Sequence, residues 1–129
     1  GHRFPMSKYR LLREALLREG VMTEAQLSPS PYVALSDLLL VHDPVYVEGI
    51  KLNTLDPKAA RPIGLPLGED LYQRSLASVG GYVEACQHAL KTGFAGQLAG
   101  GTHHAFADKR EGFCVYNDFA VAAVKLLKE

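Results

Sequence analysis

The hydrophobic pattern near the start of the chain predicts an amphipathic helix over Ser7–Glu19. Tyr9, Leu12 and Leu16 fall on one face of that helix, and Gly20 follows it as a natural stop. The arginines between these apolar positions are expected to face solvent, because charged residues opposite an apolar stripe usually mark the exposed side of a helix. The helix is therefore expected to lie on the surface of the protein.

The longest apolar stripe predicts a second helix over Asp70–Lys91. Six side chains recur along it at spacings of four and three residues: Tyr72, Leu76, Val79, Val83, Cys86 and Leu90. Gly93 is expected to end this helix. The Gly80–Gly81 pair lies in its middle, where each glycine costs about 1 kcal/mol relative to alanine. Another segment is therefore expected to pack very closely against that point.

Two short apolar runs predict strands. Leu38–Val41 is consistent with a strand buried on both faces, and Gln97–Ala99 with a second strand parallel to it. Asp43 can cap a helix over Val45–Ile50. His42, between the first strand and that cap, is interpreted as a hydrogen-bonded structural histidine.

The last apolar run, Phe119–Val124, predicts a helix that is buried almost all round. Asn117 or Asp118 can cap this helix, which is expected to continue through Leu127. The resulting order of strand, helix, strand and helix indicates an α/β fold with a parallel sheet.

Composition and charge exclude several classes of function. The 129 residues are 47% hydrophobic and 22% charged, which is an ordinary balance for a folded globular domain. Basic and acidic residues both total 14, so no nucleic-acid or membrane partner is indicated. Cys86 and Cys114 have neither a zinc-ribbon nor a disulfide-framework spacing, and we interpret both as free thiols. No segment reaches the ~20 apolar residues that cross a bilayer, so a cytoplasmic location is the default expectation.

The candidate chemistry gathers in residues 100–118. The adjacent pair His103 and His104 follows two glycines, and Gly112 and Phe113 come shortly afterwards. Histidine titrates nearest physiological pH, so a pair in a glycine-bounded loop is a plausible place to manage a proton. A phenyl ring beside a flexible loop could wall a narrow slot for an extended apolar chain. From these residues alone, two solvated or hydrogen-bonded loop histidines are the simpler alternative.

The whole string resembles the signature of the histone deacetylase superfamily. Order, spacing and residue type agree over Gly100–Ala105, Gly112–Cys114 and Asn117–Asp118, and weaker similarity extends from His2–Pro5 to the C-terminus. The resemblance implies a three-layer α/β/α fold with a parallel sheet, of the arginase/deacetylase type and incomplete here. Residues 1–129 would form the N-terminal part of a single deacetylase catalytic domain.

The resemblance also implies a reaction. Members of the family hydrolyse an acyl group from an amine, typically acetyl-lysine or an acetylated polyamine, with a zinc-bound water. By resemblance, His104 would be the general base that takes the proton of that water, and His103 would assist electrostatically. Gly112 and Phe113 would line the slot for the acylated amine, and Cys114 would sit beside the metal without ligating it.

The zinc ligands that the resemblance implies are not expected in this chain. The family holds zinc with an Asp-x-His pair and a further Asp, and no Asp-x-His occurs in the sequence. The ligands are expected beyond Glu129, so the isolated chain is expected to be inactive. The Gly64–Pro66 segment falls where the eukaryotic enzymes carry an acidic residue that grips the peptide, and its lack of an acid favours a bacterial or class IV-like branch.

Two other functions remain open at this point. A non-catalytic binding or assembly module could retain the same scaffold. Alternatively, Cys114 with His103 or His104 could form a Cys-His hydrolase, although the sequence offers no evident orienting partner. A partial domain would also expose sheet edges and one face of the Phe119–Val124 helix, which predicts self-association or pairing with a complementary chain.

Overall fold

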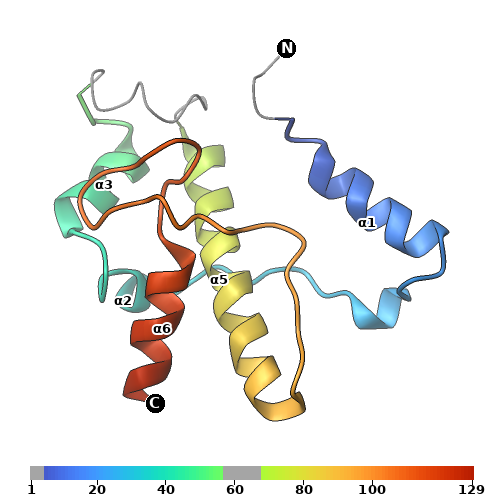
Figure 1. The fold of residues 1–129 in the computed structure, drawn as a ribbon. Coiled ribbons are helices and arrows are strands. Elements are labelled where there is room, and N and C mark those ends of the chain that lie inside the picture. The colour runs from blue at the N-terminus through green and yellow to red at the C-terminus, as the bar shows by residue number, and fades with distance from the viewer. Residues whose placement is uncertain (1–4, 57–67) are drawn as a thin grey trace.

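The computed structural model describes residues 5–56 and 68–129. Its regular elements are helices, named here in chain order: α1 (Lys8–Arg18), the 3-10 helix η1 (Glu24–Gln26), α2 (Leu35–Leu38), α3 (Pro44–Leu52), α5 (Glu69–Thr92) and α6 (Asp118–Lys128). Figure 1 shows α5 in the middle of the molecule, with α6, α2 and α3 on one side of it and α1 on the other. The Gly64–Pro66 segment lies outside the described residues.

The three longest predicted helices are confirmed. The helix predicted over Ser7–Glu19 is α1, and the one predicted over Asp70–Lys91 is α5, which ends at Gly93 in a left-handed conformation (φ 91°). The helix predicted after residue 117 is α6. At its start the side-chain oxygen of Asn117 accepts a hydrogen bond from the amide of Ala120 at 2.9 Å, which is the capping contact expected there.

The predicted cap of α3 is also present. One carboxylate oxygen of Asp43 accepts hydrogen bonds from the amides of Val45 at 2.8 Å and Tyr46 at 3.2 Å. Pro44 occupies the first helical position, where its missing amide proton costs nothing. The chain leaves this helix through Asn53, whose φ of 55° is left-handed.

Both predicted strands are wrong for the described part of the chain. The Leu38–Val41 run contains the end of α2 and a following turn, in which the amide of His42 donates to the carbonyl of Leu38 at 3.0 Å. A short apolar run is compatible with a buried helix end as well as with a strand, so periodicity could not separate the two. Gln97–Ala99 has no strand partner within residues 5–56 and 68–129, where the sole bridge joins Glu111 and Cys114.

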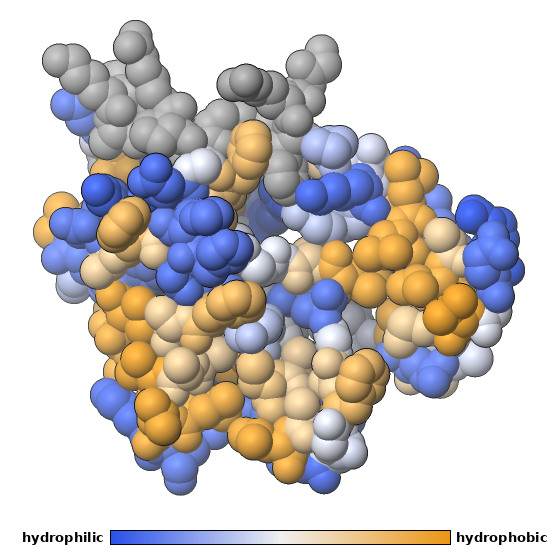
Figure 2. All heavy atoms as spheres, in the orientation of Figure 1, coloured by the Kyte–Doolittle hydropathy of each residue, from blue (hydrophilic) through white to orange (hydrophobic). Residues whose placement is uncertain are grey.

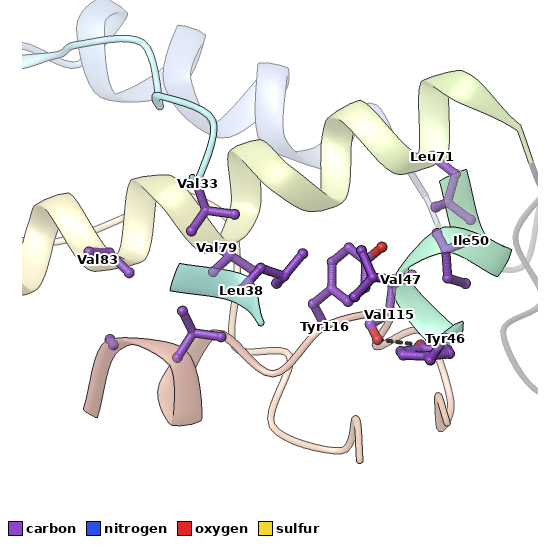
Figure 3. Close-up of a cluster of buried hydrophobic side chains, with 12 residues drawn as sticks. Val33, Leu38, Tyr46, Val47, Ile50, Leu71, Val79, Val83, Val115 and Tyr116 are labelled. Carbon is purple, nitrogen blue, oxygen red and sulfur yellow. Dashed lines mark hydrogen bonds between the residues drawn. The ribbon is translucent and has the colours of Figure 1, made fainter. Parts of the chain in front are cut away.

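The core lies where α5 packs against α6, α3 and the segment before α2 (Figure 3). It contains Val33, Leu38, Tyr46, Val47, Ile50, Leu71, Val79, Val83, Val115, Tyr116, Val121 and Ala122. The phenolic hydroxyl of Tyr46 donates a hydrogen bond to the carbonyl of Val115, drawn as a dashed line in Figure 3. This bond ties α3 to the end of the segment that precedes α6.

The close approach predicted at Gly80–Gly81 is confirmed. A Cβ on Gly80 would lie far inside contact distance of the backbone carbonyl of Pro31. The amide of Val33 donates to the carbonyl of Leu76 at 3.1 Å, which holds the same segment against α5. Only a residue without a side chain fits at that contact.

Burial of α6 is less complete than predicted. Val121 and Ala122 are buried, but Phe119 is 43% exposed and Leu127 is 88% exposed. Leu90, predicted on the apolar stripe of α5, is also exposed. Figure 2 shows apolar side chains gathered over the lower part of the face drawn there, below the grey atoms, and over α1. Among the described residues, no helix combines the length and apolar character needed to span a bilayer.

Candidate active site

The segment between α5 and α6 carries the histidine pair on a backbone that requires glycine. Gly100 and Gly101 have φ values of 101° and 78°, in the left-handed region that side chains rarely allow. A Cβ on Gly100 would lie 2.5 Å from the side-chain oxygen of Gln97 and 2.8 Å from a carboxylate oxygen of Asp118. The turn therefore needs glycine both for its conformation and for the space around it.

The two histidine rings lie against each other. The ring centroids of His103 and His104 are 4.1 Å apart, and the His103 ring stacks on Phe119 at 5.9 Å with an interplanar angle of 14°. Nδ1 of His103 is 3.0 Å from the carbonyl oxygen of Gly101. Because that oxygen can only accept, the contact is a hydrogen bond when Nδ1 carries a proton. Both side chains are exposed to solvent.

The residues predicted to act together line one cavity of about 660 Å³. His103 and His104 lie on its wall, and Gly112, Phe113 and Cys114 also line it. Residues 93–117 connect α5 to α6 without a helix or a strand, so this convergence depends on the folded loop. Leu71, Ser75 and Tyr116 add a buried part of the wall behind the loop.

Two side chains at the start of α6 hold the histidine loop. Asp118 is completely buried, and its carboxylate accepts hydrogen bonds from the amides of Gly101 at 2.7 Å and Thr102 at 2.9 Å. The side-chain amide of Asn117 donates to the carbonyls of His103 at 3.2 Å and Ala105 at 3.0 Å. Sequence reasoning gave both residues a capping role alone. The sequence signal was an acid immediately after an asparagine, and the burial of that acid emerges only in the structure.

His42 is confirmed as a structural histidine. Its Nε2 accepts a hydrogen bond from the amide of Asn117 at 2.9 Å, and its Nδ1 is 3.2 Å from the carbonyl oxygen of Ala107. One nitrogen accepts while the other faces an acceptor, so the ring is neutral and protonated at Nδ1. Burial lowers the pKa of His42, and the backbone carbonyls of Ala107 and Phe106 partly oppose that shift.

A model of the histone deacetylase domain matches residues 2–129. The chain belongs to the histone deacetylase family. An uncharacterized protein of Picosynechococcus is 47% identical over 121 residues, which cover 94% of this chain and 40% of that protein. The acetoin utilization protein AcuC of Staphylococcus aureus is 32% identical over 139 residues, which cover 99% of this chain and 36% of that protein. The chain thus spans well under half of the curated relatives it matches.

Solved deacetylase structures share this arrangement of the chain. The histone deacetylase homolog from Aquifex aeolicus superposes with a TM-score of 0.76 and 30% sequence identity, over 95% of this chain and 34% of that one. A structure of a histone deacetylase homolog complexed with SAHA gives the same values. The family fold is therefore present, although the described residues do not themselves contain the parallel sheet or its three layers.

Cys114 is a buried thiol. Burial raises the pKa of the Cys114 thiol, the backbone amide of His104 partly opposes the shift, and the charge of Asp118 adds to it. A raised pKa disfavours the thiolate that a cysteine nucleophile requires. The Cys-His hydrolase alternative is weakened accordingly. Cys86 and Cys114 are both free, as predicted.

The described residues do not form a zinc-binding site by themselves. Within that part of the chain, no three His, Cys, Asp or Glu side chains lie close enough together to hold a metal. His103 and His104 are adjacent, but Asp118 directs its carboxylate at backbone amides instead of joining them as a ligand.

Proposed function

We propose that the protein containing this chain is a hydrolase that removes an acyl group, such as acetyl, from an amine. The observation that carries the proposal is the cavity lined jointly by His103, His104, Gly112 and Phe113 in a chain of the histone deacetylase family. A proton-transfer pair beside a walled slot is suited to amide hydrolysis, in which water must lose a proton and the leaving amine must gain one.

The two histidines divide that work. His104 takes the proton of the attacking water and later donates it to the departing amine. His103, whose Nδ1 faces the carbonyl of Gly101, stabilises charge next to it and helps to orient the water. The 4.1 Å separation of the two ring centroids supports joint action on one group. General acid–base catalysis of this kind contributes typically about 10²–10⁴-fold to a rate.

Gly112 and Phe113 form the slot for the substrate. Gly112 has a φ of 56°, and Phe113 lines the cavity while remaining 39% exposed. The substrate class is an acylated amine, with acetyl-lysine and acetylpolyamine as its members. A structural relative is complexed with SAHA, which supports the presence of a ligand slot.

Zinc dependence is proposed for the whole protein and not for these residues. We place residues 1–129 in the N-terminal part of a single catalytic domain, with the metal ligands contributed from outside them. The isolated chain is then inactive. The free thiols of Cys86 and Cys114 support a cytoplasmic location. A non-catalytic module that keeps this scaffold is the alternative.

The experiment is a deacetylation assay of the whole protein with an acetyl-lysine peptide and an acetylpolyamine as separate substrates. Turnover of either substrate is expected, with a loss of about 10²–10⁴-fold in kcat for His104→Ala. His88→Ala is the matched control, because His88 is an exposed histidine on α5 that does not line the cavity. A folded whole protein that turns over neither substrate would favour the non-catalytic module.

A further inference from the structure

We propose that Asn117 is a positioning residue that fixes the backbone on both sides of His104. This inference rests on the proposed function, because the placement of His104 matters for turnover only if that side chain moves a proton. Asn117 does not line the cavity, so it does not act on a bound molecule directly. Its effect reaches His104 through two backbone carbonyls.

The first step is the orientation of the Asn117 side chain. Its oxygen Oδ1 accepts a hydrogen bond from the amide of Ala120 at 2.9 Å, at the start of α6. A side-chain amide whose oxygen faces a donor must turn its NH2 group to the other side. The assignment of oxygen and nitrogen therefore follows from the partners, and Nδ2 has two protons to donate away from the helix.

The second step is the destination of those two protons. Nδ2 donates to the carbonyl of His103 at 3.2 Å and to the carbonyl of Ala105 at 3.0 Å. The first carbonyl belongs to the peptide that precedes His104, and the second lies one residue beyond it. Because each peptide is planar, holding both carbonyls limits the rotation of the backbone around His104 and the direction in which its side chain leaves the chain. Neither bond uses a ring nitrogen, so both act on the backbone alone.

The third step is the anchorage of Asn117 itself. Its backbone amide donates to Nε2 of His42 at 2.9 Å, and His42 is only 2% exposed. Its backbone carbonyl accepts the amide of Val121 at 3.1 Å in the first turn of α6. Both the main chain and the side chain of Asn117 are therefore held, which makes the residue a rigid link between α6 and the histidine loop.

Capping of α6 alone does not need the two bonds to the loop. Serine and aspartate cap a helix about as well as asparagine, but neither carries an NH2 group. A serine at position 117 therefore retains a cap for α6 and loses both bonds to the carbonyls. This substitution separates the stability of the helix from the placement of His104.

The test uses Asn117→Ser in the whole protein, with the acetyl-lysine peptide and the acetylpolyamine as substrates. The value of kcat is expected to fall by about 10- to 100-fold while KM stays near its wild-type value, because a misplacement of about 1 Å can cost as much as 10²-fold in rate. Hydrogen–deuterium exchange at the backbone amides of residues 103–106 is expected to become at least about tenfold faster, because the loop has lost two of its bonds.

Asp43→Ser is the matched control, because it also replaces one cap residue by another, at the start of α3. In the contacts described, the side chain of Asp43 bonds only to amides of that helix. This variant is expected to leave kcat and the exchange of residues 103–106 unchanged. The proposal is overturned if Asn117→Ser leaves both quantities at their wild-type values, or if Asp43→Ser changes them equally.

If Asn117→Ser does not fold, the wild-type protein decides. The side-chain amide protons of Asn117 are expected to exchange at least about tenfold more slowly than those of a free asparagine, and exchange at the free rate refutes the proposal. The exchange measurements do not depend on hydrolysis. A protein that turns over neither substrate refutes the proposed function, while the exchange difference still tests the hold of Asn117 on the loop.

Discussion

His42 and Asn117 lie 75 positions apart in the sequence, and Nε2 of His42 accepts a hydrogen bond from the amide of Asn117 at 2.9 Å. The bond fixes the start of α6 against the turn that leads into α3. It also requires an unprotonated Nε2, because only a nitrogen without a proton can accept. The position of the residues that hold the histidine loop therefore depends on the charge state of a buried ring.

The stability of the chain is expected to fall in mild acid because of His42. Burial lowers the pKa of His42 in the folded state, so the unfolded chain binds this proton more readily. The stabilisation is complete above the unfolded pKa of about 6.5 and declines as the pH falls through that value towards the folded pKa. Urea unfolding across this range is the measurement. His42→Gln should flatten the profile, and an equally steep profile in that variant would assign the effect to other groups.

Gly80→Ala is expected to destabilise the protein, although alanine has a higher helix propensity than glycine. Alanine is favoured over glycine by about 1 kcal/mol inside a helix. The new Cβ, however, would meet the carbonyl of Pro31, which is backbone and cannot rotate away, and overpacking of this kind costs typically about 1–3 kcal/mol. Gly96→Ala is the control, because Gly96 has open space around its Cβ position. Thermal unfolding of the two variants separates these effects, and a stabilised Gly80→Ala would show that the contact yields.

Tyr46→Phe is expected to cost about 0.5–1.5 kcal/mol, because it removes the donor to the carbonyl of Val115 and leaves that buried acceptor unpaired. Tyr32→Phe is the control, since Tyr32 is 60% exposed and its hydroxyl donates a long hydrogen bond to the side-chain oxygen of Gln73 at 3.4 Å. Denaturant unfolding measures both changes. Equal losses in the two variants would mean that the buried bond adds nothing.

The exposed apolar side chains of α6 are expected to drive self-association or pairing with a complementary chain. Phe119 and Leu127 are exposed on this helix, and Leu90 and Phe94 are exposed at the end of α5. Sedimentation coefficients should therefore rise with protein concentration, and Leu127→Lys should reduce that rise. Val45→Lys is the matched control, because Val45 is equally an exposed aliphatic residue but lies on α3. A monomer at every concentration would contradict the expectation.

Several features of the fold and of the candidate site followed from local sequence signals. The spacing of apolar residues located α5, and Asp43 and Asn117 marked the starts of α3 and α6, because a cap bonds to amides only two or three positions away. The glycines at 80 and 81 predicted a close contact but did not identify Pro31 as the neighbour. The motif around His103 and His104 led to the family, while the roles of those two residues stay predictions.

The remaining features depend on segments that are distant in the sequence. Leu38–Val41 can form a strand only if a partner strand lies beside it, and otherwise the chain turns after α2. The hydrophobicity of these residues carries no information about such a partner. The exposure of Phe119 and Leu90 likewise depends on what covers them. Asp118 reaches the amide of Thr102 only after the chain has returned through the loop. Local signals determined where helices begin and end because their bonds are local. Tertiary packing decided which polar groups meet around the histidine pair, because those bonds join residues that only the folded chain brings together.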